Sequence, residues 1–166
     1  TRKALQLKTF SNMLGPLVNP SSPQHQLLGT YNLQIARLYH YILQEEAVNY
    51  GIVHALDGYD EISLTGAFKL CTKRGEQLIT PEDLGLKQVV PSALFGGKSV
   101  ADAAKIFKTI IEGKGTEAQN NVVLTNAAFA LQIVAESCSF QDAFAVAKDS
   151  LFGLKAKKCL EKLIDE

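Results

Sequence analysis

The spacing of apolar residues between positions 27 and 56 constrains the fold more than any other feature of this chain. Residues 27–31 and 51–56 are short apolar runs, which are typical of buried strands. Between them, apolar residues recur with helical spacing over 32–47, and Asn32 is a suitable N-cap. A strand, a helix and a second strand in this order predict a right-handed βαβ unit with parallel strands.

The rest of the chain predicts a hairpin followed by helices. Residues 65–72 and 76–80 flank Lys73-Arg74-Gly75, a turn that ends in glycine, so we expect two antiparallel strands there. The helical pattern over 117–136 is apolar almost all round, which predicts that this helix is the most buried. We therefore expect an α/β fold in which a mostly parallel sheet, containing the βαβ unit and the hairpin, is covered by helices.

Composition and charge exclude several classes of protein. The 17 basic and 17 acidic residues cancel, so no net positive field would attract nucleic acid. No apolar run reaches the roughly 18 residues of a membrane span. The three cysteines lack the spacing of a zinc site and are typical of free thiols in a reducing cytosol. We expect one α/β domain over 1–166, in a cytoplasmic protein without a nucleic-acid or membrane partner.

Two adjacent carboxylates, Asp60 and Glu61, follow the second predicted strand and the turn at 57–59. In open α/β sheets, ligands bind outside the C-terminal ends of the strands. Adjacent carboxylates also suit Mg²⁺ that is held together with substrate phosphates. An acidic pair in a surface loop is more often only solvated charge. From spacing alone, both a metal site and a solvated turn stay open.

No residue of the chain is assigned a catalytic role from its pattern. No Ser/His/Asp or Cys/His pairing indicates covalent catalysis, and neither a Walker loop nor Gly-x-Gly-x-x-Gly occurs. His54 lies inside the second apolar run, which predicts a hydrogen-bonded core histidine more than a catalytic base.

Four segments carry a resemblance to a known family. They are residues 2–20, 26–31, 54–64 and 78–85. In order and spacing they resemble the C-terminal half of anthranilate phosphoribosyltransferase, and the likeness runs from about Arg2 to the final helix. Its most specific parts are Asn-Met-Leu-Gly-Pro-Leu-Val-Asn-Pro, from position 12, and Asp-Glu-Ile-Ser-Leu-Thr, from position 60.

The resemblance implies an activity and a set of site residues. The intact enzyme would transfer the phosphoribosyl group of phosphoribosyl pyrophosphate to anthranilate, in tryptophan biosynthesis, and would require Mg²⁺. The resemblance assigns Asp60 and Glu61 to the metal. It assigns Arg2 to the anthranilate carboxylate, with which a guanidinium can form a bidentate pair. Gly15 and Pro16 would line the path of the aromatic acceptor. The intact enzyme would be a homodimer.

The resemblance also identifies family features that these residues lack. The family's Gly-Thr-Gly-Gly-Asp loop, which holds pyrophosphate, and its Lys-His-Gly-Asn segment do not occur in the 166 residues. We therefore expect the C-terminal part of a longer protein, without N-terminal helical and phosphate-binding segments and inactive by itself. Gln6 and Lys8 stand where the family commonly has glycine and arginine, and lysine loses the planar fork of arginine.

Three alternatives stay open. A pyrimidine nucleoside phosphorylase should lack both the pattern at 12–20 and the Asp60-Glu61 pair. A non-catalytic relative that binds nucleic acid should have a basic surface, which the zero net charge disfavours. The third alternative is a separately folded structural fragment without activity.

Overall fold

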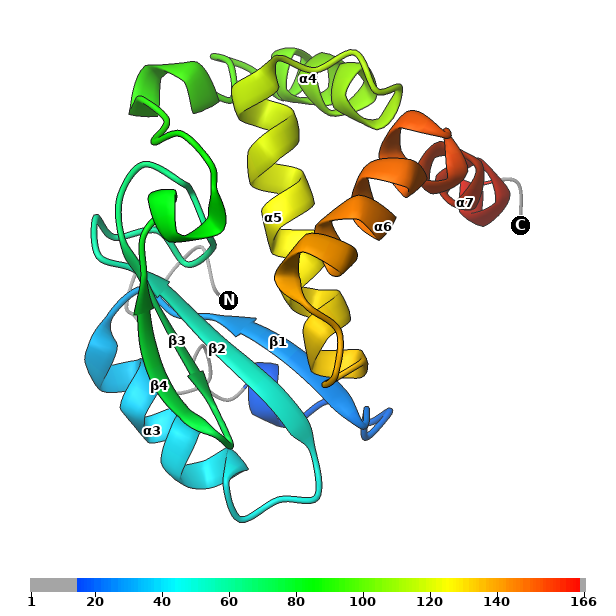
Figure 1. The fold of residues 1–166 in the computed structure, drawn as a ribbon. Coiled ribbons are helices and arrows are strands. Elements are labelled where there is room, and N and C mark those ends of the chain that lie inside the picture. The colour runs from blue at the N-terminus through cyan, green and yellow to red at the C-terminus, as the bar shows by residue number, and fades with distance from the viewer. Residues whose placement is uncertain (1–14, 165–166) are drawn as a thin grey trace, which may run out of the picture.

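The computed structural model describes residues 15–164 (Figure 1). The strands are β1 (His25–Gly29), β2 (Asn49–Ala55), β3 (Phe68–Thr72) and β4 (Gly75–Ile79). The α-helices are α3 (Leu33–Leu43), α4 (Val100–Ile111), α5 (Glu117–Val134), α6 (Phe140–Phe152) and α7 (Lys155–Ile164). Three short 3-10 helices are η1 (Gly15–Leu17), η2 (Glu82–Leu84) and η3 (Pro91–Leu94).

The four strands form one mixed sheet in the order β1-β2-β3-β4. β1 and β2 run parallel with α3 between them in sequence, which confirms the βαβ unit. The prediction of a mostly parallel sheet is wrong, because β2–β3 and β3–β4 are both antiparallel. The connection from β2 to β3 contains no helix that could carry the chain back across the sheet, so β3 pairs in the opposite direction. The predicted hairpin is confirmed.

Both strands of the βαβ unit begin two residues earlier than the apolar pattern predicts. β1 covers His25–Gly29, and β2 covers Asn49–Ala55. Asn32 caps α3 as expected, because its side chain accepts a hydrogen bond from the N–H of Ile35 at 2.9 Å. The helix ends at Leu43, four residues before the predicted limit.

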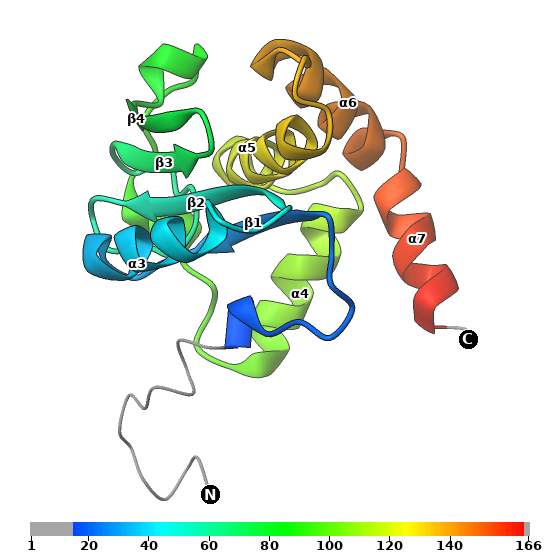
Figure 2. The same ribbon diagram turned by 90° about the horizontal axis from the view of Figure 1, so that it is seen from below.

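The sheet is covered on both faces, by α3 on one and by α5 on the other (Figure 2). The side chains of β2 alternate between the two faces, as a strand requires. Tyr50 and Ile52 pack in the cluster on the α3 side, whereas Val53 and Ala55 pack in the cluster on the α5 side. Because both faces are buried, β2 reads as an almost continuous apolar run.

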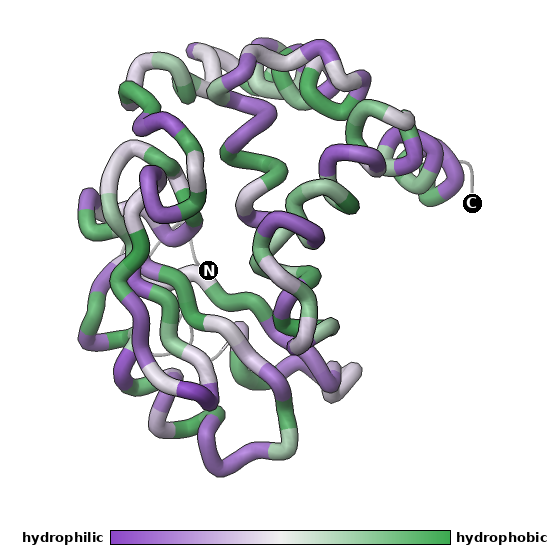
Figure 3. Tube along the Cα trace, viewed as in Figure 1, coloured by the Kyte–Doolittle hydropathy of each residue, from purple (hydrophilic) through white to green (hydrophobic). Residues whose placement is uncertain are grey.

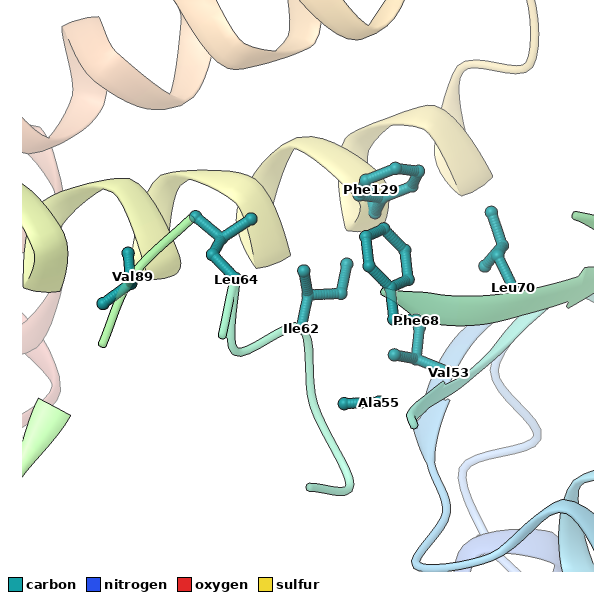
Figure 4. Close-up of a cluster of buried hydrophobic side chains, with 8 residues drawn as sticks. All are labelled: Val53, Ala55, Ile62, Leu64, Phe68, Leu70, Val89 and Phe129. Atoms are coloured by element: carbon teal, nitrogen blue, oxygen red, sulfur yellow. The ribbon is translucent and has the colours of Figure 1, made fainter. Parts of the chain in front are cut away.

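Helix α5 contains more buried residues than any other helix of the described chain, as predicted: Asn120, Leu124, Thr125, Ala128 and Phe129. The Phe129 ring packs edge-to-face on Phe68 of β3, with centroids 5.5 Å apart (Figure 4). The helix is not buried all round, since Val123 and Val134 are exposed.

The remaining helices lie at the periphery. Helix α6 packs on α5, and α7 follows it. Neither α4 nor α7 contains a buried residue, and hydrophobic and hydrophilic residues alternate along both (Figure 3). Within 15–164, none of the helices combines the length and the apolar character that crossing a membrane requires.

Candidate functional site

The loop 56–67 joins β2 to β3 and carries the acidic pair to the C-terminal end of β1. At that end stands Gly29, which lies against the backbone of Asp60. A Cβ atom added to Gly29 would lie 1.6 Å from the Asp60 carbonyl oxygen. Only glycine therefore allows this close approach. The acidic pair lies at the sheet edge where α/β proteins bind ligands.

The side chains of Asp60 and Glu61 are exposed. No hydrogen bond or ion pair joins either carboxylate to another residue within 15–164. Their oxygens are therefore available to a ligand, unlike those of Asp57, which accepts a hydrogen bond from the Thr65 hydroxyl. Two adjacent free carboxylates are hard oxygen donors of the kind that Mg²⁺ prefers.

Below the acidic pair, the loop is anchored in the core. Ile62 and Leu64 are fully buried, and their side chains point toward α5 (Figure 4). Leu64 has φ of 58°, a left-handed conformation that is rare for a residue with a branched side chain. Its carbonyl oxygen accepts a hydrogen bond from the N–H of Val89 at 2.8 Å, which helps to hold that conformation.

The carboxamide of Asn126, on α5, binds the backbone on both sides of Ile62. Its Oδ1 accepts from the Ile62 N–H at 3.1 Å, and its Nδ2 donates to the Ile62 carbonyl oxygen at 2.8 Å. The sequence analysis did not identify this residue. The available signal was a single amide side chain within the apolar stretch 122–131.

Hydrogen bonds between side chains connect Ser63 and Thr65 to Asp57, near the start of the loop. The Ser63 hydroxyl lies 2.6 Å from that of Thr65, which donates to the Asp57 carboxylate. The Gln88 amide donates to the Thr65 carbonyl oxygen at 2.5 Å. Ser63 and Thr65 are buried, so these bonds form away from solvent and are correspondingly strong. These hydrogen bonds hold residues 63–65, the part of the loop that follows the acidic pair.

His54 is a core residue, as predicted. It is 7% exposed, and its Nδ1 lies 2.7 Å from the carbonyl oxygen of Thr30. Because a carbonyl can only accept, Nδ1 carries the proton and donates. The imidazole thus ties β2 to the end of β1 beneath the acidic loop.

The other expected site residues lie apart from the acidic pair. Gly15 and Pro16 form the start of η1 and line an open groove of about 540 Å³ along residues 25–28 of β1. Asp60 and Glu61 do not line this groove. Arg2 lies outside the described residues. Asp60 and Glu61, which are neighbours in sequence, thus lie at the C-terminal end of β1, whereas Gly15 and Pro16 lie beside residues 25–28 of that strand.

A better-enclosed cavity of about 310 Å³ lies at the opposite end of β2, beside Asn49 and Tyr50. The ion pair between Arg74 and Glu136, at 2.5 Å, forms part of its lining. Although this cavity is the more enclosed of the two, it is not the candidate substrate site. It lies at the N-terminal end of the parallel strand, whereas α/β sheets bind ligands at the C-terminal end.

Comparison with known proteins relates the chain to a family of glycosyl transferases. A family model described as the a/b domain of a glycosyl transferase family matches residues 1–156. The anthranilate phosphoribosyltransferase of Flavobacterium johnsoniae is 54% identical over 162 residues, which are 98% of this chain and 49% of that protein. That of Bacteroides fragilis strain YCH46 is 50% identical over 164 residues, 99% of this chain and 50% of the relative.

Solved structures of the same enzyme share the fold. Anthranilate phosphoribosyltransferase from Thermus thermophilus superposes with a TM-score of 0.83 at 26% identity, over 97% of this chain and 48% of that one. The Saccharomyces cerevisiae enzyme, solved in complex with PRPP and Mg, gives 0.85 at 24% identity, over 99% of this chain and 47% of that one. The chain spans about half the length of the curated relatives it matches.

Proposed function

The chain belongs to the glycosyl transferase family defined by this a/b domain, and on that premise we propose that it is the metal- and substrate-binding part of an anthranilate phosphoribosyltransferase. In this reaction, the bond from ribose C1 to pyrophosphate breaks and a bond from C1 to the anthranilate nitrogen forms. The amine releases a proton, and pyrophosphate leaves. Part of the catalytic task is therefore to stabilise a leaving group that carries several negative charges.

One observation carries the proposal: Asp60 and Glu61 are exposed and unpaired within 15–164, on a loop whose base is buried. Asp60 and Glu61 would hold Mg²⁺, which when bound neutralises charge on the leaving pyrophosphate. No group of three His, Cys, Asp or Glu residues that could hold a metal occurs in the described part of the chain. Two carboxylates fit a cation that completes its coordination with phosphate oxygens and water.

The ligands of the relatives support the choice of substrates. The S. cerevisiae enzyme was solved with PRPP and Mg and also with 4-fluoroanthranilate. In this chain, Gly15 and Pro16 would lie along the path of the acceptor, and Arg2 would pair with its carboxylate. The phosphate-cradling segments would come from outside these 166 residues. The intact protein would be a homodimer.

The test neutralises the acidic pair in a full-length protein that carries this sequence. In the double variant Asp60→Asn/Glu61→Gln, we expect turnover to fall by roughly 10²–10³, since an electrostatic group at the leaving pyrophosphate is lost. The Mg²⁺ concentration for half-maximal rate should rise. Because the carboxylates have no partner in the described fold, the free energy of unfolding should change by less than about 1 kcal/mol. Pyrophosphate release and urea unfolding are measured on the same preparation.

The matched control is Glu45→Gln/Glu46→Gln. Glu45 and Glu46 are also an adjacent exposed acidic pair, but they follow α3 and lie away from the proposed site. This variant should keep the wild-type rate and Mg²⁺ dependence. A large loss of stability with unchanged Mg²⁺ dependence in the first variant would show that Asp60 and Glu61 are structural residues.

A further inference from the structure

The carboxamide of Asn126 joins helix α5 to the acidic loop by hydrogen bonds. Asn126 and Ile62 are 64 positions apart in sequence. The carboxamide nevertheless pairs with Ile62 as a neighbouring strand would, accepting from its N–H and donating to its carbonyl oxygen. The Ile62 side chain is fully buried beneath α5 (Figure 4). Backbone and side chain of Ile62 are thus both held by the same region of the molecule.

The bond to the Ile62 N–H acts on Glu61. That N–H belongs to the peptide unit that joins Glu61 to Ile62, and a peptide unit is planar. Fixing the N–H therefore fixes the orientation of this peptide unit, which includes the Glu61 Cα atom that carries the side chain. Between the two acidic residues, the carbonyl of the peptide unit that joins Asp60 to Glu61 lies against Gly29. The backbone of the pair is therefore restrained at its middle and at its C-terminal end, while its carboxylates stay exposed to solvent.

Asn126 is itself held in place before any ligand binds. Its Nδ2 donates to the Val122 carbonyl oxygen, one turn earlier on α5, at 2.9 Å as well as to Ile62. Rotating the carboxamide would break all three hydrogen bonds, two of them to backbone groups of a partly buried segment. Leaving such groups unpaired is costly, so the amide stays in one orientation.

We propose that Asn126 is a positioning residue, which sets the geometry of Asp60 and Glu61 for binding a divalent cation together with pyrophosphate. This inference rests on the proposed function, because it concerns how the same acidic pair is held. Residues that orient metal ligands without touching the metal typically change metal affinity about 10–100-fold when mutated. A side chain that only stabilised the fold would alter stability and leave metal affinity unchanged.

The test compares Asn126→Ala and Asn126→Asp in a full-length protein that carries this sequence. The first variant removes all three hydrogen bonds, and the second keeps the shape but turns the donor into an acceptor facing two carbonyl groups. Mn²⁺ replaces Mg²⁺, and free Mn²⁺ is counted by electron paramagnetic resonance with phosphoribosyl pyrophosphate present. We expect the Mn²⁺ dissociation constant to rise about 10–100-fold in both variants. The KM for anthranilate should stay at its wild-type value.

Asn120→Ala is the matched control. Asn120 is a buried asparagine on the same helix, and its Nδ2 donates to the Gly115 carbonyl oxygen at 3.0 Å instead of to the acidic loop. Its loss should lower stability, as for Asn126→Ala, without changing the Mn²⁺ dissociation constant. Thermal unfolding of all variants shows whether losses of stability are comparable.

Wild-type Mn²⁺ affinity in folded Asn126 variants, or equal losses of affinity in Asn126→Ala and Asn120→Ala, would overturn the inference while leaving the proposed function intact. A wild-type protein that binds no Mn²⁺ and releases no pyrophosphate would instead overturn the proposed function. If neither Asn126 variant folds, hydrogen exchange on the wild type decides. The Ile62 amide should then exchange slowly, and fast exchange would contradict a stable hydrogen bond between Asn126 and Ile62.

Discussion

At the scale of single residues, the acidic site depends on small and uncharged neighbours. Gly29 lets the loop approach β1, and Asn126 forms hydrogen bonds with the loop backbone. The Thr65 hydroxyl donates a hydrogen bond to the Asp57 carboxylate. These contacts leave Asp60 and Glu61 as the acidic residues of the loop without a protein partner in the described fold. Because these neighbours bind the loop backbone and leave both carboxylates unpaired, they support the proposed role of the pair in binding a ligand.

Gly29→Ala should displace the loop that carries Asp60 and Glu61. The added Cβ would meet the Asp60 carbonyl oxygen at 1.6 Å, so the loop must move. We expect a loss of about 1–3 kcal/mol in the free energy of unfolding, as for other overpacked positions. Gly66→Ala is the control in the same loop, because its Cβ would meet only the Asp57 side chain, at 3.9 Å. Urea unfolding measures both, and equal effects would contradict the contact.

Cys71 supplies a pH dependence. Burial, with the nearby Glu76 carboxylate, raises the pKa of the Cys71 thiol from its ordinary 9.0 to about 11. The unfolded chain therefore ionises first, so this group lowers stability as the pH rises from 9 to 11, with no effect below that window. Cys71→Ala should flatten the fall in stability over this window. The measurement is urea unfolding at several pH values, and identical slopes would contradict the assignment.

At the scale of secondary structure, α5 connects the core to the site. Its N-terminus is a complete capping box, in which Thr116 and Gln119 bind each other's backbone. Its middle packs on the sheet through Phe129 and carries Asn126 to the loop. Helix α3, on the other face, ties to β2 through the hydrogen bond between His40 and Tyr50, at 2.9 Å. Changes in α5 should therefore reach the site more directly than changes in α3.

Phe129→Ala tests the contact between α5 and the sheet. The ring is 5% exposed and packs on Phe68 and Phe140, with centroids 5.5 and 5.4 Å away. Truncation should cost about 3–5 kcal/mol, from lost burial and the cavity that remains. Val123→Ala, on the exposed side of the same helix, should change stability by less than about 0.5 kcal/mol. Denaturant midpoints of the two variants compare the faces, and similar losses would show that α5 is seated differently.

At the scale of the whole molecule, two apolar clusters sandwich the sheet and the acidic loop closes one of them. Ile62 and Leu64 belong to the cluster beneath α5, so site and core are built from the same segment. The chain spans about half the length of its curated relatives, and the pyrophosphate-binding glycine loop of the family is not among its residues. The groups that bind pyrophosphate in the proposed reaction would therefore come from outside these residues.

The purified 166-residue chain should not catalyse the reaction by itself. Loss of one preorganised electrostatic element alone costs about 10²–10³ in rate, and a whole phosphate-binding loop is missing from these residues. Pyrophosphate release from phosphoribosyl pyrophosphate and anthranilate provides the assay, with a full-length relative as positive control. Turnover of about one per second, an ordinary enzymatic rate, would refute the expectation.

The sequence by itself determined the features that depend on neighbours along the chain. Helical and strand periodicity predicted the βαβ unit, the hairpin and the buried α5, and the Asn32 cap follows from local hydrogen bonding. The resemblance to anthranilate phosphoribosyltransferase was confirmed by relatives about half identical to the chain. The adjacency of Asp60 and Glu61 is a local fact of the same kind.

Only the tertiary structure decided which segments meet. The antiparallel pairing of β2 with β3 depends on how a loop without a helix turns, which periodicity does not encode. The contact of Gly29 with Asp60, and that of Asn126 with Ile62, join positions far apart in sequence. Such contacts form because the packed core brings the segments together, and no local pattern of residues records that packing.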